Sequence, residues 1–404
     1  MPSFTLVDHC LSGLGGHPIR MAETFLEADA NNEAWGRKFC ELKHPRLFCH
    51  FSLATWLPGY HFPAIPQCGA TKWRKAVHGL ECLRVLTRTN LLYFKELLAI
   101  KRDPASIWFV PNTGLYNLLG MVIYATCFRR QRIVCYFQSA PSRHLKKCGL
   151  LARLFRLRNL KFVSENERMS RQTSDVLGQP VHSLLFPLLP PRWLNVDLRP
   201  AARSQRPLRI IVLGLPRREK GFHWLPRIAE QLRPELVEQN VSFLIQTDDD
   251  SVRREQLDQE LALLVQEPGI RFINSALGPE QYLRALHDSD AVFTPYTRAG
   301  YAERLSWIAI EALALGKPVL VTDATLAADV LKKFRCGLFF DEGDIEAMAA
   351  AVRTLIRQRS RLDQQAVEAA KAFREENNPA RFFAQLQTLF GIASSRSEAA
   401  SESV

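Results

Sequence analysis

Residues 208–214 read LRIIVLG, a short apolar run, rich in β-branched side chains, that ends in a glycine. Such a run predicts a buried strand followed by a tight turn. The stretch from Phe222 to Leu236 carries apolar residues at helical spacing and predicts a helix after that turn. A strand, a loop and a helix in this order form the repeating unit of a parallel, doubly wound sheet.

The same alternation continues toward the C-terminus. Strands are predicted at residues 241–246, 270–273, 291–295 and 319–322, and helices at 258–264, 279–287 and 307–315. Strands that alternate with helices over this distance indicate βαβ units. We therefore expect one Rossmann-like domain over residues 208–372.

The first half of the chain shows the same elements less regularly. Strands are predicted at residues 4–7, 107–110, 133–137 and 162–164, and helices at 17–28 and 115–128. We expect an α/β chain with a second Rossmann-like domain over residues 1–186. The proline-rich residues 187–207 indicate an interdomain linker, residues 373–392 a C-terminal helix, and the small, polar residues 393–404 a disordered tail.

Cysteine usage and hydropathy suggest where the chain works. The nine cysteines are scattered and form no CxxC pair, so neither a disulfide framework nor a zinc site is expected. The longest apolar stretch, residues 115–128, is too short to span a bilayer, which needs roughly 20 residues. The first residues lack the basic and apolar regions of a signal peptide. We expect a cytoplasmic protein.

The positive charge of the chain lies in its first half. Residues 1–200 carry 27 Lys and Arg against 13 Asp and Glu, a net charge of +14, whereas the remainder carries −2. An uneven positive field favours an anionic partner, either nucleic acid or an acidic lipid leaflet, although a merely solvated basic surface gives the same count. No nucleic-acid reader motif is present, so we expect no nucleic-acid partner.

Residues 143–161 read RHLKKCGLLARLFRLRNLK and combine leucines with basic side chains. A basic amphipathic helix of this kind can lie in a membrane interface. The alternative is an ordinary Rossmann helix that packs its leucines on the sheet and leaves its arginines in water. The first reading predicts peripheral contact with the inner face of the cytoplasmic membrane.

Residues 295–323 read PYTRAGYAERLSWIAIEALALGKPVLVTD and place Glu303 and Glu311 with seven residues between them, ahead of a predicted strand. This segment resembles the Glu-x7-Glu motif of retaining GT-B glycosyltransferases, the glycosyl transferases group 1 or family 4-like enzymes. The resemblance implies a GT-B fold, in which two Rossmann-like domains with parallel doubly wound sheets face a central cleft. It also implies that Glu311 binds the ribose of a nucleotide-sugar and that Glu303 lies beside the transferred sugar.

One part of the motif departs from the family pattern. The first Glu is usually followed by Gly-Phe-Gly, whereas Arg304, Leu305 and Ser306 stand here. Some relatives instead carry a Tyr, Arg, Ser pattern, which Tyr301, Arg304 and Ser306 match. Whether Glu303 or this set contacts the sugar stays open, and Ser306 is included among the donor-binding candidates.

The loop from Gly214 to Gly221 reads GLPRREKG and follows the first strand of its domain. Cations at a helix N-terminus can stabilise the charge on a diphosphate leaving group without a metal. The Lys220-Gly221 pair resembles the family's Lys-Gly, but Leu215 stands where the family has Arg. We expect Lys220 and Arg217 to be catalytic and, with Arg218 and Gly214, to bind the donor, with no metal and no cofactor.

The N-terminal half offers fewer candidates. A glycine loop after the first strand brings Gly15 and Gly16 to the donor and His17 to the acceptor side, since glycines let backbone approach a ligand closely. Asn112 and Gln138 follow predicted strands and can bond sugar hydroxyls. The family often has a His at the second of these strand ends, and this chain has none there.

The sequence therefore predicts a hexosyltransferase-like enzyme that moves a sugar from a nucleotide-diphosphate sugar to a glycan or lipid-linked acceptor, with retention and without metal. Asp248-Asp249-Asp250 satisfies the Asp-x-Asp pattern of metal-dependent glycosyltransferases, but its place after a middle strand favours a solvated loop. Three alternatives stay open: a GT-B nucleotide-sugar epimerase, a catalytically inactive relative, and a basic nucleic-acid-binding protein.

Overall fold

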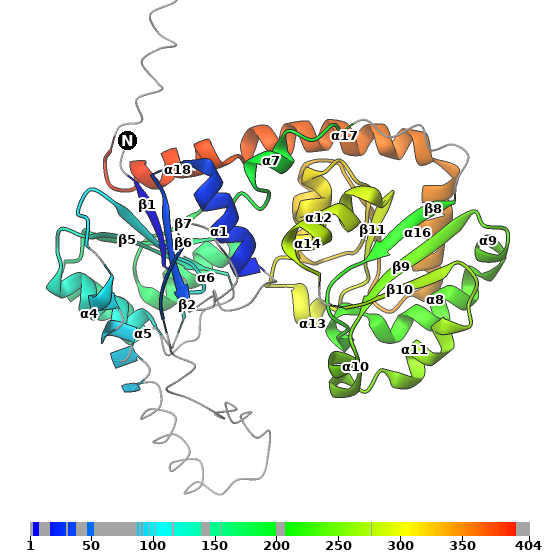
Figure 1. The fold of residues 1–404 in the computed structure, drawn as a ribbon, viewed down its shortest axis with the longest axis horizontal. Helices are drawn as coiled ribbons and strands as arrows, with labels where there is room; N and C mark the ends of the chain where they lie inside the picture. The colour runs from blue at the N-terminus through cyan, green and yellow to red at the C-terminus, as the bar shows by residue number, and fades with distance from the viewer. Residues whose placement is uncertain are drawn as a thin grey trace, which may run out of the picture. The chain divides into compact units, whose positions relative to one another are not determined.

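The computed structural model describes residues 3–7, 17–29, 31–37, 47–51, 87–114 (without 89, 92, 96 and 101), 117–138, 146–198 (without 155) and 207–392 (without 276). The chain divides into two compact units. The N-terminal unit groups Met1–Leu14, Met21–Phe186 and Pro379–Val404, and the C-terminal unit groups Gly15–Arg20 and Pro187–Asn378. Each unit contains a parallel sheet with helices (Figure 1).

The sheet of the N-terminal unit has the strand order β3-β2-β1-β4-β5-β6-β7, and every pair is parallel. The four strands predicted from sequence are confirmed. Strands β2, β3 and β7 were not predicted. The sequences EAWGR of β2 and VHS of β7 are too polar or too short to show a strand period, whereas the apolar LFCHF of β3 was overlooked. The bounds are β1 (Phe4–Val7), β2 (Glu33–Arg37), β3 (Leu47–Phe51), β4 (Ile107–Val110), β5 (Arg132–Phe137), β6 (Leu160–Ser164) and β7 (Val181–Ser183).

Aromatic side chains fill one side of this sheet. The last helix, α18 (Pro379–Thr388), places Phe383 4.9 Å from Phe25 and Phe382 5.6 Å from Phe109, measured between ring centroids. The C-terminal helix therefore packs with the N-terminal unit, because its two phenylalanines complete that unit's core. The other helices of the unit are α1 (His17–Ala28), α4 (Leu118–Cys127), α5 (Lys146–Leu154) and α6 (Glu167–Leu177).

The sheet of the C-terminal unit has the order β10-β9-β8-β11-β12-β13, again wholly parallel. From β8 the chain winds outward through β9 to β10 and then returns to place β11 on the other side of β8. Ligands of doubly wound sheets bind at the carboxyl ends of the two strands at which this order reverses, here β8 and β11. The bounds are β8 (Leu208–Val212), β9 (Val241–Thr247), β10 (Ile270–Asn274), β11 (Ala291–Thr294), β12 (Val319–Thr322) and β13 (Leu338–Phe340).

The helices of this unit are numbered from α7 to α17. Those predicted at 258–264, 279–287 and 307–315 are confirmed within one residue at each end. The bounds are α7 (Pro191–Leu194), α8 (Leu225–Gln231), α9 (Arg233–Val237), α10 (Asp249–Glu255), α11 (Asp258–Val265), α12 (Pro279–Asp288), α13 (Arg298–Tyr301), α14 (Trp307–Ala314), α15 (Leu326–Lys333), α16 (Ile345–Arg357) and α17 (Arg359–Glu376), with single 3₁₀ turns η2 (Arg218–Lys220) and η3 (Phe222–Trp224).

Three predictions about this part of the chain need correction. The single helix expected from Phe222 to Leu236 is instead η3, α8 and α9, because a proline begins each of the two α-helices and cannot continue a preceding one. The proline-rich residues 187–207 include α7, and their described part groups with the C-terminal unit. Helix α17 continues past residue 372 to Glu376. The tail 393–404 lies outside the described residues.

Arg374 explains why the C-terminal unit extends past the predicted boundary. Its guanidinium donates to the carbonyl of Ala314 at 2.7 Å and to the carbonyl of Leu194 at 2.5 Å. It thereby connects the end of α17 to α14 and α7. Arg374 is half-buried, and this burial lowers its pKa to about 10.

Candidate active site

The turn after β8 is shaped by two glycines. Gly214 has φ +93° and donates its N–H to Oε1 of buried Gln246 at 2.8 Å. Gly221 has φ +73° and lies so close to Pro295 that a Cβ would collide with the Pro295 carbonyl. Both backbones are in the region that glycine alone adopts at low cost. The loop is therefore held against the end of β11, and Lys220 lies between its two anchors.

The connection after β11 is joined to this loop through Glu219. The backbone carbonyl of Glu219 accepts from the N–H of Thr297 at 2.8 Å. Its carboxylate oxygen Oε1 accepts from Arg217 at 2.8 Å and from Arg304 at 2.6 Å. Glu219 Oε1 thus bonds one arginine from the loop after β8 and one from the loop after β11, the two strands at which the strand order reverses.

Lys220 is a buried cation in this arrangement, with 8% of its surface exposed. Burial, followed by the nearby positive charge of Arg217, lowers its pKa to about 7, while Glu219 opposes the shift and Arg304 adds to it. Among the described residues no carboxylate forms an ion pair with its ammonium. A desolvated ammonium without a counter-ion is an anion-binding group.

Glu311 lies within α14 and is completely buried. Its carboxylate accepts from the Arg20 guanidinium, which belongs to the same compact unit, and from the Tyr282 hydroxyl at 2.8 Å. The Arg20 guanidinium also lies 4.3 Å from the centre of the Tyr282 ring. Burial raises the pKa of the Glu311 carboxyl above its usual 4.5 despite the pull of Arg20. Arg20 and Tyr282 therefore satisfy the buried carboxylate of Glu311, the one charged side chain of α14.

The two other candidates of the motif lie apart from each other. Glu303 is exposed in the bend after α13. Ser306 is buried and occupies the N-cap position of α14, beside the hydroxyl of Tyr296. Arg304 stacks on the Tyr301 ring, with 4.3 Å between guanidinium and centroid. Of the Tyr301, Arg304 and Ser306 set, Arg304 joins Arg217, Glu219 and Lys220, and these four residues are called the Lys220 cluster below.

Arg218 points away from that cluster. Its guanidinium donates to the carbonyl of Gln256 at 2.7 Å and to the carboxylate of Glu260 at 3.0 Å. The single 3₁₀ turn η2 separates the directions of adjacent side chains, so Arg217 bonds Glu219 whereas Arg218 closes the end of α10. The structure does not bring Arg218 together with the other donor-site candidates.

Two of the acceptor-side candidates lie at one edge of the N-terminal sheet. Asn112 follows β4 and Gln138 follows the neighbouring strand β5, so both lie at the carboxyl edge. Asn112 has φ +55°, and Gln138 donates to the sulfur of Met21 at 3.3 Å. His17 is the first residue of α1. Gly15 and Gly16 lie outside the described residues.

The aspartates at 248–250 have a structural role at a helix start. Asp248 is the N-cap of α10 and accepts from the N–H groups of Asp250 and Ser251. A hydrogen bond with the Ser251 side chain, followed by these backbone bonds, lowers the pKa of its carboxyl. Asp249 and Asp250 occupy the first turn, where negative charge suits the helix dipole. These residues begin a helix, which corrects the expectation of a loop. In the part of the chain that the structure describes, no group of three His, Cys, Asp or Glu could hold a metal.

Four residues of this region were missed by sequence reasoning. They are Glu219, Gln246, Arg20 and Tyr282. Gln246 could have been found from the sequence, because it is a polar residue near the end of the largely apolar strand VSFLIQT. Glu219 lies within the loop itself and was passed over among its cations, whereas Arg20 and Tyr282 reach Glu311 from distant segments, which no local pattern encodes.

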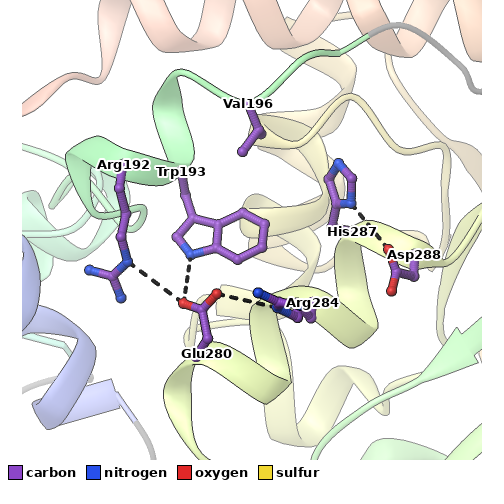
Figure 2. A pocket seen from close by; sticks show the side chains of 7 residues that line it. All are labelled: Arg192, Trp193, Val196, Glu280, Arg284, His287 and Asp288. Atoms are coloured by element: carbon purple, nitrogen blue, oxygen red, sulfur yellow. Dashed lines mark hydrogen bonds and ion pairs between the residues drawn. The ribbon is translucent and has the colours of Figure 1, made fainter.

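A separate pocket of about 380 Å³ lies between α7 and α12 (Figure 2). The carboxylate of Glu280 accepts from the indole N–H of Trp193 at 3.4 Å and lies 3.4 Å from Nε of Arg284. Figure 2 shows Arg192 beside the same carboxylate, at 3.7 Å. The polar groups of this pocket bond one another, and none of the predicted site residues lies among them.

A family model matches most of the C-terminal unit. Residues 207–358 match the family model described as glycosyl transferases group 1. Among curated proteins no sequence matches the chain. In the described part of the structure, no helix is both long and apolar enough to cross a membrane.

Similar solved structures extend over nearly the whole chain. The α,α-trehalose 6-phosphate synthase of Burkholderia multivorans is 15% identical, with a TM-score of 0.62 and full coverage of both chains. The N-terminal domain of Candida albicans trehalose-6-phosphate phosphatase is 12% identical, with a TM-score of 0.65, and the match covers 96% of this chain and 97% of that one. At these identities the likeness establishes the fold. The family match, which covers residues 207–358, and this fold support a glycosyltransferase of the GT-B type.

Proposed function

We propose that the enzyme transfers a sugar from a nucleoside-diphosphate sugar to a glycan or lipid-linked acceptor, with retention and without a divalent metal. The observation that carries the proposal is the buried Lys220 ammonium, with Arg217 close by, at the carboxyl ends of β8 and β11. Cleavage of the donor places negative charge on the leaving diphosphate. Fixed cations in a desolvated site stabilise that charge more in the transition state than in the ground state.

The other donor-side residues follow from this placement. Glu311 takes the ribose hydroxyls, which requires Arg20 or Tyr282 to release one of its two oxygens. Gly214 lets the diphosphate approach the backbone beside Lys220, and Ser306 lies at the N-terminus of α14, where positive dipole charge is available. Glu303, exposed in the same connection, faces the sugar.

The acceptor side is assigned to the N-terminal unit. Asn112 and Gln138 end neighbouring strands, and their amides can both donate to and accept from sugar hydroxyls. His17, the first residue of α1, is the third acceptor-side candidate, and Gly15 and Gly16 stay candidates for the donor. A structure from E. coli with a similar fold is bound to UDP-2-fluoro glucose, and one from Burkholderia xenovorans is a complex with glucose-6-phosphate. These ligands support a nucleotide-sugar donor for this chain.

The first experiment screens nucleotide-sugars for thermal stabilisation, because a ligand that binds only the folded state raises the unfolding temperature. With the stabilising donor, Lys220→Ala should lower turnover by roughly 100-fold. Lys371→Ala, which removes an exposed lysine of α17, is the matched control. Parental turnover in Lys220→Ala would refute the proposed site.

Two further measurements test the mechanism. The anomeric configuration of the product, followed by NMR during the reaction, should match that of the donor, and an inverted product would refute retention. Activity should persist in a chelator, so loss of activity that manganese restores would refute the metal-free reaction. Conversion of the donor without any acceptor would identify a nucleotide-sugar epimerase instead.

Peripheral contact with an acidic membrane is proposed for the N-terminal unit. Helix α5 turns Gly149 toward α6, so tightly that a Cβ would collide with the Leu177 carbonyl. Its opposite side leaves Leu150 54% exposed and Leu154 66% exposed. The two leucines are one turn apart and share a face. Exposed basic side chains surround them, namely Lys146, Arg153, Arg156 and Arg158.

The structure also corrects the extent of this segment. The single helix expected over residues 143–161 ends at Leu154, and Arg156 has φ +50°, which an α-helix does not tolerate. Leu157 beyond it is buried, as the alternative reading expected, and residue 160 begins β6. The exposed surface is therefore one short helix and the turn after it. A lipid-linked acceptor would explain why the acceptor-side unit carries it.

A further inference from the structure

Arg304 lies at the Lys220 cluster although it comes from a different loop. Its Nη2 donates to Glu219 Oε1 at 2.6 Å, and its guanidinium stacks on Tyr301 at 4.3 Å from the ring centre. Tyr301 in turn packs on Tyr296, with 4.2 Å between centroids. The Glu219 carboxylate and the two buried tyrosines therefore hold the guanidinium in one position. A ligand that binds it loses little affinity to ordering of the Arg304 side chain.

The loop after β8 has no cationic side chain at position 215. Leu215 is 39% exposed and offers no cation there. The side chain of Arg304 is also 39% exposed, so it can meet a ligand from solvent. A guanidinium has five N–H donors, of which one bonds Glu219 and another bonds the Tyr301 side chain. The remaining donors suit the paired oxygens of a phosphate.

We infer that Arg304 binds the diphosphate of the donor and that Glu219 positions it there. This inference rests on the proposed function and deepens it. Glu219 is a negative group near a negative ligand, but the cluster holds Lys220, Arg217 and Arg304 against this single carboxylate. The excess positive charge of the cluster attracts the diphosphate. Oε1 of Glu219 pairs with both Arg217 and Arg304 and so offsets the repulsion between their two charges.

Inorganic pyrophosphate is the probe for this inference, with affinity measured by calorimetry on the full chain. Arg304→Met should weaken binding about 10- to 100-fold, the effect of losing a charge-assisted hydrogen bond. Arg304→Lys should restore part of the affinity but not the bidentate contact. Arg298→Met is the matched control, because Arg298 belongs to the same connection but bonds Asp341 at 2.5 Å instead.

The pH dependence of binding separates positioning from a merely structural role. The charged groups that act on Lys220 are Arg217 and Glu219 of its own loop and Arg304 of the loop after β11. Arg304 lowers the pKa of Lys220 and Glu219 raises it. Relative to the parent, Arg304→Met should therefore move the pH at which Lys220 loses its proton upward, and Glu219→Gln should move it downward. Equal midpoints in both variants would contradict the assigned positions.

The outcomes distinguish this inference from the proposed function. If Lys220→Ala loses pyrophosphate binding but Arg304→Met keeps parental affinity, the donor site stands and the role of Arg304 is refuted. If Lys220→Ala also keeps parental affinity, or the parent binds no pyrophosphate, the donor site itself is refuted and the inference with it. If Arg298→Met weakens binding as much as Arg304→Met, the effect is one of general charge, and the inference is overturned.

Discussion

Gly214 and Lys220 occupy adjoining space, since a Cβ atom at position 214 would collide with the Nζ of Lys220. The backbone of Gly214 thus forms the surface against which the buried ammonium rests. Lys220 Nζ is the free end of a flexible side chain and can move at little cost to the fold. A side chain at position 214 therefore changes the position of a charge more than it changes stability.

Gly214→Ala should lower kcat/KM for the donor by about tenfold or more, because displacement of the ammonium removes a contact with the leaving group. The unfolding temperature should fall only modestly. Gly343→Ala is the control: Gly343 has φ +75°, similar to the +93° of Gly214, but its nearest neighbour would lie 3.7 Å from the new Cβ. An equal loss of activity in both variants would show that backbone strain, not the ammonium, is responsible.

Stability should depend on pH through Lys220. Its pKa is about 7 in the folded protein against 10.5 ordinarily, so between these values the unfolded state binds more protons and stability rises with pH. Below pH 7 the charged form is buried and the cost is complete, on the order of 5 kcal/mol. Lys220→Met should therefore stabilise the protein at pH 6 and have less effect at pH 10.

Denaturant unfolding at the two pH values tests this expectation. Lys371→Met, at an exposed site paired with Glu368, is the control and should change stability little at either pH. If Lys220→Met gave the same change at pH 6 and pH 10, the ammonium would not be desolvated in the folded protein, and its pKa would be ordinary.

Arg20 and Glu311 should show the behaviour of a buried ion pair. Arg20→Met leaves the Glu311 carboxylate enclosed without its cation, and we expect a loss of about 3–5 kcal/mol in the free energy of unfolding. The double variant Arg20→Met with Glu311→Leu should recover most of that loss, because apolar groups replace both charges. Tyr282→Phe removes only the hydroxyl that donates to Glu311, so its effect should be smaller. Additive losses would indicate that Arg20 and Glu311 are not coupled.

Much of the C-terminal unit could be predicted from its sequence. Strand 208–212 and the alternation after it are local patterns of apolar residues, and they were sufficient for the parallel sheet. Lys220 and Glu311 were predicted from the resemblance of their segments to family motifs, Lys220 also from its place in the loop after a strand, and their role in donor binding stays a prediction. The outward direction of Arg218 was not, because a single 3₁₀ turn sets it.

The partners of these residues could not be predicted for a different reason. Arg20 is 291 residues from Glu311 in the sequence, and Arg304 is 85 residues from Glu219. Such contacts depend on which strand ends the topology brings together. The order β9-β8-β11 decides that the loops after β8 and β11 meet, and the sequence shows the strands without showing their order.

The last prediction concerns membrane contact through α5 and the turn after it. Arg153, Arg156 and Arg158 changed together to Glu should abolish sedimentation with liposomes that contain acidic lipid, since each cation contributes about 1 kcal/mol near an anionic surface. Leu150→Ser with Leu154→Ser should weaken sedimentation as well, because these exposed side chains supply the apolar contact. Binding by the parent should fall as salt shortens the range of the field.

The control reverses three exposed arginines of the C-terminal unit, Arg253, Arg357 and Arg361, and should leave sedimentation unchanged although the net charge changes equally. Loss of binding in the control would mean that net charge alone decides the interaction, without a defined surface. Equal recovery of the parent in the supernatant with acidic and neutral liposomes at low salt would refute membrane contact. If the leucine variant bound like the parent while the arginine variant did not, the contact would be electrostatic only, and α5 would rest on the headgroups without entering the apolar layer.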